Sequence, residues 1–266
     1  MLDMFSYAFM QRAFIVAIVI AFIAPCIGVS IVLKRLSAIG DATSHSALAG
    51  IALGLVIGIN PILGGLLFSI LAVLSIEFFR KAFSKFSEIA AVIVMSTGIG
   101  LTAIISGFIT SGSSNLNGFL FGSIVAISNF EMCLTIVLGA IVEIVFTLLR
   151  HELFFVTFDE EAARLAGVKT KLVNTTLMIL TAITVSVASR VVGALMISSL
   201  MVIPVACAMM IGKSYRLTVF WSIIFAQAFS IFGLIISYLA DLRPGGTIVL
   251  LGVVTLIILM AFNRDR

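Results

Sequence analysis

Long runs of residues without a charged side chain constrain the fold of this chain more than any other feature. About 20 apolar residues are enough for a helix to cross a hydrocarbon core ~30 Å thick. Runs of about that length or longer cover residues 13–33, 89–130, 191–212, 217–240 and 244–263. Hydrophobic residues also make up 62% of the 266 residues, more than a soluble domain of this size could bury. The sequence therefore predicts an integral membrane protein.

The lengths of the apolar segments predict an all-α fold, a polytopic transmembrane helical bundle of about nine spans, with eight as the alternative. The segment 118–127, GFLFGSIVAI, is too short to cross and is expected to form a short re-entrant or interfacial half helix. No stretch is left for a soluble domain, so residues 1–266 are expected to form a single transmembrane domain. The predicted spans are residues 11–33, 37–58, 61–79, 88–110, 129–149, 172–190, 193–211, 216–239 and 246–262.

The positions of lysine and arginine predict the orientation. With the N-terminus outside, only Arg12, Arg190 and Arg243 of the 16 basic residues lie outside or near the outer ends, as the positive-inside rule requires. The C-terminus is then cytoplasmic and the loop SGSSNLNG (111–118) faces outward. Because topology explains the basic residues, the net charge of +4 does not call for a nucleic-acid partner. The predicted cytoplasmic set is Lys34, Arg35, Arg80, Lys81, Lys85, Arg150, Arg164, Lys169, Lys171, Lys213, Arg216, Arg264 and Arg266.

Two ionisable residues occur inside the second apolar segment, in the stretch GDATSHSALAG (40–50). Asp41 and His45 are four residues apart, so their side chains leave the same face of a helix, one turn from each other. At 1.5 Å per residue from Arg35, they would lie roughly 9 and 15 Å deep. An unpaired charge in the membrane costs about 2.5 to 3.5 kcal/mol on insertion scales, which indicates a functional role.

A carboxylate and an imidazole are a ligand pair suited to Zn²⁺, Mn²⁺ or Fe²⁺. Two ligands are too few for a closed site. Two copies of the chain, related by a two-fold axis along the membrane normal, would supply two Asp and two His to one ion. Two alternatives stay open at this point: a proton relay, and a structural role in which Asp41 bonds to His45 or pairs with Arg190.

Glycines repeat every four residues on one face of the same segment, which lets another helix approach closely and places the segment inside the bundle. They are Gly50, Gly54 and Gly58. Elsewhere, Glu143 is a weaker candidate for the pathway, and Glu77 and Glu131 are interpreted as interfacial or helix-pairing residues.

The longest charged stretch, residues 150–171, is predicted to be cytoplasmic. Three acidic residues there precede a short run rich in alanine, and Gly167 follows as a candidate C-cap, so a short surface helix is expected. It is read either as a solvated connector or as a docking element. The acidic residues are Asp159, Glu160 and Glu161.

Motifs for enzymatic chemistry are missing from the sequence. There is no GxxxxGK[ST] phosphate-binding loop, no HExxH pair and no nucleophile elbow. The chain is therefore expected to be no enzyme, and any ATP hydrolysis is expected on a separate chain.

Four stretches together resemble the membrane permeases of bacterial ATP-binding-cassette importers for zinc, manganese and iron, over nearly the full length. The strongest is LKRLSAIGDATSHSALAGIALG (33–54), which is similar to the family signature of a basic pair, GDxxxH and a small-residue helix. The others are FDEEAARLAGV (158–168), RVVGALMISSLMVIPVACA (190–208) and RPGGTIVLL (243–251). The last has Gly245 and Gly246 where the family often has another proline.

The resemblance implies a permease in the bacterial plasma (inner) membrane that works as a homodimer in the lipid bilayer. Its partners would be a cytoplasmic ABC ATPase dimer, which grips a coupling segment at about residues 157–168, and an extracytoplasmic metal-binding protein. Asp41 and His45 match the family's metal-pathway ligands. Residues implied in coupling to the ATPase are Asp159, Glu160, Glu161 and Arg164.

The expected function is import of a divalent transition metal into the cytoplasm, with zinc favoured. The stretch SHSALAG lacks the proline often found after the histidine in manganese-type members and looks nearer to zinc-type members. The alternatives are a manganese or iron(II) importer of the same family, and a secondary cation carrier coupled to protons. The metal is cargo, so no permanently bound cofactor is expected.

Overall fold

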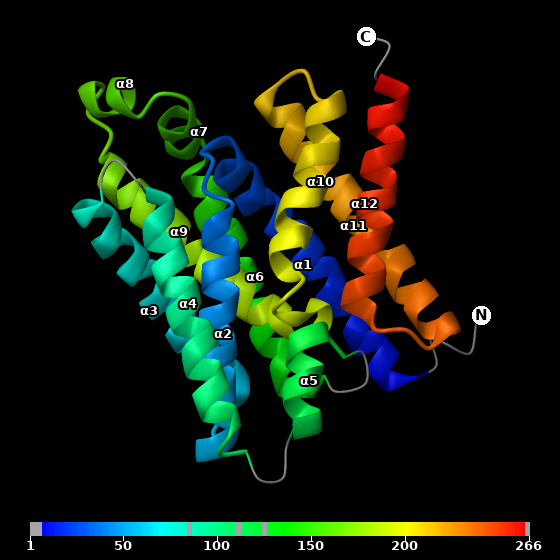
Figure 1. The fold of residues 1–266 in the computed structure, drawn as a ribbon. Coiled ribbons are helices and arrows are strands. Elements are labelled where there is room, and N and C mark those ends of the chain that lie inside the picture. Colours follow the sequence, from blue (N-terminus) through cyan, green and yellow to red (C-terminus); the bar gives the residue numbers. More distant parts are fainter. Residues whose placement is uncertain (1–6, 84–86, 110–112, 124–126, 264–266) are drawn as a thin grey trace.

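Helices account for nearly all of the chain that the computed structural model describes, which is residues 7–83, 87–109, 113–123 and 127–263 (Figure 1). This confirms the predicted all-α fold. The helices are α1 (Ala8–Leu33), α2 (Ala38–Ile57), α3 (Pro61–Ala82), α4 (Ser87–Ser106), α5 (Ser113–Phe121), α6 (Asn129–Leu148), α7 (Arg150–Phe158), α8 (Glu160–Leu165), α9 (Thr170–Ala188), the π-helical turn η2 (Ser189–Gly193), α10 (Ile197–Ile211), α11 (Tyr215–Ala240) and α12 (Pro244–Asn263).

Eight helices in the described residues are long and apolar enough to cross a membrane: α1, α2, α3, α4, α6, α9, α11 and α12. The remaining predicted span, residues 193–211, corresponds to α10, which is apolar but only 15 residues long. The predicted ends agree with the observed ones to within about one helical turn.

Side chains at the helix starts explain several of these boundaries. Asn60 accepts a hydrogen bond from the backbone two residues on, and Pro61 opens α3 at a position where its missing N–H costs nothing. Ser128 and Glu131 form a reciprocal capping box at the start of α6. Ser214 caps α11, because its hydroxyl oxygen accepts a hydrogen bond from the Leu217 N–H.

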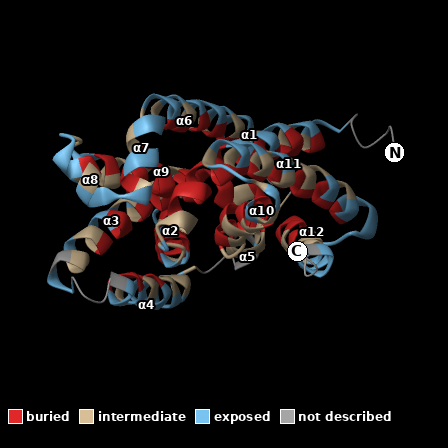
Figure 2. Ribbon diagram, turned by 90° about the horizontal axis from the view of Figure 1, so that it is seen from above, coloured by how far each residue is buried: buried red, intermediate tan, exposed pale blue. Residues whose placement is uncertain are grey.

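The helices differ greatly in burial. Most residues of α1, α2 and α9 are buried, whereas most of α4, α6 and α12 is not. Seen along the bundle, α9 lies at the centre and α4 and α12 at the edge, with α2 between α4 and α9 (Figure 2). The helix that carries Asp41 and His45 is therefore an inner one, as its small residues predicted.

The predicted half helix exists in shifted form. Residues 113–118, expected to be part of an outward loop, form the first turns of α5, and the helix ends at Phe121 rather than near residue 127. Residues 124–126 of the predicted segment lie outside the described residues, as do Lys85, Arg264 and Arg266. The prediction placed this helix too late because it followed the apolar run, whereas the polar residues Ser113, Ser114 and Asn115 supply the first turn.

Backbone groups of α5 bond to the chain where α9 gives way to α10. The Ser123 N–H donates to the Arg190 carbonyl at 3.1 Å, and the Ala194 N–H donates to the Phe119 carbonyl at 2.8 Å. These bonds satisfy irregular backbone around η2 inside the protein. Non-helical backbone at membrane depth is tolerated only under that condition.

One end of the bundle carries α7, α8 and the last turn of α12, and α5 lies at the opposite end (Figure 1). Helix α7 was not predicted. It forms because Leu153 and Val156, spaced three apart, are both buried under the bundle. Which end faces the cytoplasm stays a prediction from the basic residues.

Candidate functional site

Close backbone packing fixes α2 against α3. A Cβ atom added to Gly50 would lie 2.1 Å from the Gly64 carbonyl oxygen, and one added to Gly54 would lie 3.0 Å from the Pro61 Cα. Both glycines of the predicted stripe therefore act as packing residues. Gly58 does not, because nothing lies within 4 Å of it; it ends α2 in a left-handed conformation with φ of +80°.

Asp41 and His45 lie on a strip of α2, the open strip, that is less buried than most of this helix. Asp41 is exposed in the first turn of α2 and His45 is half-buried, while Ala42, Thr43 and Ser44 between them are buried. Asp41 and His45 are four residues apart on α2, so their side chains lie one turn from each other. The two side chains are thus adjacent, and in a single copy of the chain they are accessible.

The hydroxyl groups around this pair are engaged by the helix itself. Thr43 donates to the Ile39 carbonyl at 2.6 Å, and Ser46 donates to the Ala42 carbonyl at 2.9 Å. Neither the carboxylate of Asp41 nor the imidazole of His45 has a hydrogen-bond partner within the described part of the chain. Their donor atoms are therefore available to a ligand.

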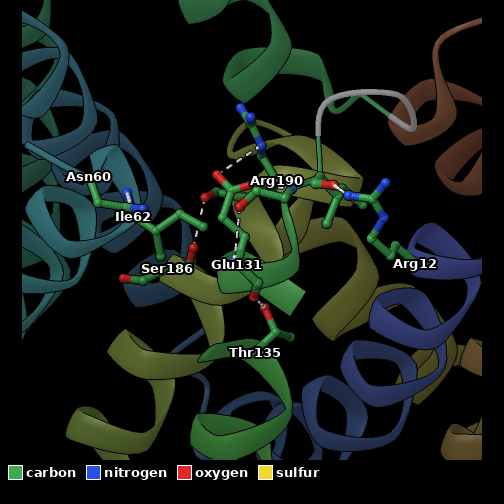
Figure 3. A network of polar contacts seen from close by, with 10 residues as sticks. Arg12, Asn60, Ile62, Glu131, Thr135, Ser186 and Arg190 are labelled. Atoms are coloured by element: carbon green, nitrogen blue, oxygen red, sulfur yellow. Dashed lines mark hydrogen bonds and ion pairs between the residues drawn. The ribbon is translucent and has the colours of Figure 1, made fainter. Parts of the chain in front are cut away.

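Arg190 is not the partner of Asp41, so the structural alternative of an Asp41–Arg190 pair is wrong. The Arg190 Nε lies 3.2 Å from Glu131 Oε1, and its guanidinium carbon lies 4.3 Å from the centre of the Phe119 ring. Glu131 Oε2 also accepts the Ser128 N–H at 2.8 Å. Figure 3 shows Glu131 and Arg190 facing each other in this network, which joins η2 to α6 and α5. Glu131 thus pairs helices, as predicted.

The other predicted carboxylates bond within their own helices. Glu143 accepts a hydrogen bond from Thr147 at 3.1 Å within α6, a helix that packs against α1 and α9. Glu77 forms an ion pair with Arg80 at 3.6 Å within α3. Neither is brought beside Asp41 and His45.

Within the described ranges, no cluster of three or more His, Cys, Asp or Glu side chains is close enough to hold a metal ion. Asp41 and His45 offer one carboxylate and one ring nitrogen per chain. Protein zinc sites use three or four ligands from the chain. A metal at this pair would need further ligands, from a second copy or from water.

The predicted surface helix is present as α8. Asp159 caps it by accepting the Ala162 N–H at 2.8 Å. Ala166 ends the helix, and Gly167 follows in the left-handed conformation, with φ of +87°, as the predicted glycine cap requires. Glu161 and Arg164 are exposed, as is the apolar Leu165 at 86%. Both interpretations of this segment, a connector and a docking element, stay open.

Glu160 differs from its acidic neighbours because its carboxylate bonds to a side chain on another helix. Its Oε1 accepts a hydrogen bond at 2.9 Å from Nδ2 of Asn174, which lies in the first two turns of α9. The sequence did not single out Asn174. Only the fold reveals its role, since the pair is 14 residues apart and spans a helix boundary.

Helix α4 touches α2 at the level of His45. A Cβ atom on Gly98 would lie 2.7 Å from the Ser46 nitrogen and 2.9 Å from the His45 carbonyl carbon. Replacing Gly98 with alanine is therefore expected to destabilise the protein by about 1–3 kcal/mol, because backbone must move. The measurement is the melting temperature of the purified protein.

Gly100 is the matched control on the same helix. Nothing lies within 4 Å of a Cβ at this position, so Gly100→Ala is expected to leave the melting temperature unchanged or to raise it slightly, given alanine's better helix propensity. Equal melting temperatures for the two variants would contradict the packing argument.

Comparison with known proteins extends these observations. The model of the family described as "ABC 3 transport family" matches residues 6–263. A "Probable metal transport system membrane protein" of Treponema pallidum is 33% identical over 263 residues, which is 98% of each chain. The "Manganese import system permease protein ScaB" of Streptococcus gordonii is 32% identical over 257 residues, 97% of this chain and 91% of that one.

A solved structure described as "PsaBC from Streptococcus pneumoniae in complex with Fab" contains a similar chain. The TM-score is 0.86 at 30% sequence identity, over 96% of this chain and 91% of that chain. The likeness therefore covers sequence and three-dimensional fold over almost the same residues.

Proposed function

This chain belongs to the ABC 3 transport family, and on that premise we propose that it is the permease subunit of an importer that moves a divalent transition-metal ion into the cytoplasm. It is a multi-pass membrane protein. The observation that carries the proposal is the pair of ionisable side chains on α2, Asp41 and His45, which have free donor atoms on the open strip of an inner helix.

A second copy of the chain completes the pathway in this proposal. The open strip supplies an oxygen and a nitrogen ligand, and a symmetric dimer doubles both. Four ligands then surround one ion on the two-fold axis, a number that suits zinc and the neighbouring divalent metals. The dimer also explains why these polar groups are uncovered in one chain: the facing copy covers them.

We propose zinc as the principal cargo. The support is the stretch SHSALAG, which looks nearer to zinc-type permeases, and a donor pair that zinc accepts. The named relative from Streptococcus gordonii is a manganese permease, so manganese is the cargo that an experiment has to exclude.

The test is metal uptake into liposomes that contain the permease together with its partner ATPase. Zinc is expected to enter in the presence of ATP and external metal-binding protein, and a tenfold excess of manganese is expected not to suppress it. Stronger uptake of manganese than of zinc would show that manganese, and not zinc, is the principal cargo. Uptake without the ATPase would instead support a secondary carrier.

The segment around α8 is proposed as the docking site of the ATPase. Leu165 is an exposed apolar side chain, flanked by the exposed charges of Glu161 and Arg164. Changing Glu161 to Lys together with Leu165 to Asp is expected to weaken association with the ATPase by at least about tenfold, since buried apolar anchors dominate interface energy. Pull-down of the ATPase from detergent solution measures this.

The exposed Lys169→Glu variant, just beyond α8, is the control for charge alone. It is expected to bind the ATPase normally. Unchanged binding of the Glu161→Lys, Leu165→Asp variant would remove the docking assignment.

A further inference from the structure

Asn174 connects α8 to the end of α1, two elements that lie far apart in the sequence. Its Nδ2 donates to Glu160 Oε1 on α8 at 2.9 Å, and its Oδ1 accepts a hydrogen bond from Lys34 Nζ at the end of α1. Both ends of one amide group are therefore occupied. The result is a continuous polar bridge from α8, through the start of α9, to the junction of α1 and α2.

The bridge is partly buried, because Lys34 and Asn174 are half-buried whereas Glu160 is exposed. Lys34, Asn174 and Glu160 line a cavity of about 260 Å³ whose other walls include Arg80 and Thr157. The hydroxyl of Thr157 is buried and has no hydrogen-bond partner within the described residues. Burial lowers the pKa of Lys34, and the negative charge of Glu160 counters part of that effect.

The junction beyond Lys34 is short and tightly bonded. The Lys34 N–H ends α1 by donating to the Ser30 carbonyl at 3.1 Å, and the Leu36 N–H donates to the Ile31 carbonyl at 2.9 Å. Arg35 between them is held in the left-handed region, with φ of 59°, a conformation that costs a non-glycine residue of order 1–3 kcal/mol. Because α2 begins at Ala38, a displacement of Lys34 moves the first turn of α2.

We infer that Lys34 and Asn174 are positioning residues that transmit movement of α8 to α2, so that displacement of the docked segment shifts Asp41 and His45. This inference rests on the proposed function. Asp41 lies in the first turn of α2, directly after the junction that Lys34 anchors. Through the side chains of this bridge, a movement of α8 at the ATPase-binding end of the bundle is transmitted to the metal ligands on α2.

Replacement of Asn174 with leucine tests the bridge, because leucine has the same number of side-chain heavy atoms in the same branched arrangement but forms neither hydrogen bond. In the complex of permease and ATPase in liposomes, zinc uptake per ATP hydrolysed is expected to fall about fivefold or more, the lower limit of ordinary coupling between sites. ATP hydrolysis and ATPase association are expected to stay at the wild-type level. Thr175→Leu, one residue on, is the matched control and is expected to keep the wild-type ratio.

A second pair of variants keeps the test decisive if the leucine variant fails to fold. Glu160→Gln retains an oxygen that accepts from Asn174 and is expected to preserve the ratio of uptake to hydrolysis. Glu160→Ala removes the acceptor and is expected to lower it. A purely structural bridge would instead lower the amount of folded protein without changing this ratio.

The inference is overturned if Asn174→Leu keeps the wild-type ratio, if the two Glu160 variants behave alike, or if the ratio falls only in step with ATPase association. Each of these outcomes leaves wild-type uptake intact, and with it the proposed function. Failure of the wild-type complex to take up zinc, manganese or iron would count against the proposed function itself.

Discussion

Replacing His45 with alanine is expected to abolish metal uptake by the assembled transporter while the protein still inserts, dimerises and binds its ATPase. His45 supplies the nitrogen ligand of the proposed pathway, and no described residue is placed to replace it. Removal of a group that merely supports a metal ligand costs 10–100-fold, so loss of the ligand is expected to exceed about 100-fold. The measurement is the initial rate of ATP-dependent zinc uptake.

Ser46→Ala provides the comparison in the next position of the same helix. Its hydroxyl is buried and donates to the Ala42 carbonyl at 2.9 Å, so it plays no part in the open strip, and uptake is expected to stay near the wild-type rate. Asp41→Asn should resemble His45→Ala, because an amide is a poor ligand for zinc. A wild-type rate in His45→Ala would refute the ligand role.

Breaking the ion pair between Glu131 and Arg190 is expected to cause the largest loss of stability. Glu131 is 5% exposed, and its carboxylate meets the Arg190 guanidinium at 3.2 Å. Removal of one partner from a buried pair costs about 3–5 kcal/mol, because the remaining charge stays buried. Glu131→Ala is therefore expected to lower the melting temperature by on the order of 10 °C.

Two variants separate the charge from other effects. Glu131→Gln can still accept the Ser128 N–H, as a capping box allows, and is expected to lose less stability than Glu131→Ala. Glu77→Ala breaks the partly exposed pair with Arg80, and exposed pairs contribute only about 0–1 kcal/mol. If Glu77→Ala and Glu131→Ala lower the melting temperature equally, burial is not what makes the Glu131 pair important.

The helices could be predicted because a membrane imposes a length on each one. Charge-free runs located the ends of α1, α11 and α12 closely, since charged residues near the ends of these runs mark the water interface. Helix α10 is the exception: Ile197–Ile211 is too short to cross. Its start depends on η2, and nothing local in RVVGALM indicates a π-helical turn that is held by hydrogen bonds from a distant helix.

The candidate site was predictable in its residue types but not in its connections. The spacing of Asp41 and His45 placed both on one face of α2, and the glycine stripe correctly indicated an inner helix. Arg190 was a possible partner for Asp41 because a buried cation needs an anion, but the sequence could not choose between Asp41 and Glu131. Such choices depend on which helices meet, and only the packed fold determines that.

The bonds between α5 and the backbone of residues 190–195 have a consequence for biogenesis. The chain reaches Phe119 and Leu120 long before Ala194 and Leu195 are synthesised, so these α5 carbonyls lack their N–H donors in the nascent protein. An unbonded backbone group in lipid costs several kcal/mol. During translation α5 is therefore expected to remain at the membrane surface, and its resistance to protease should arise only in nascent chains that extend past η2.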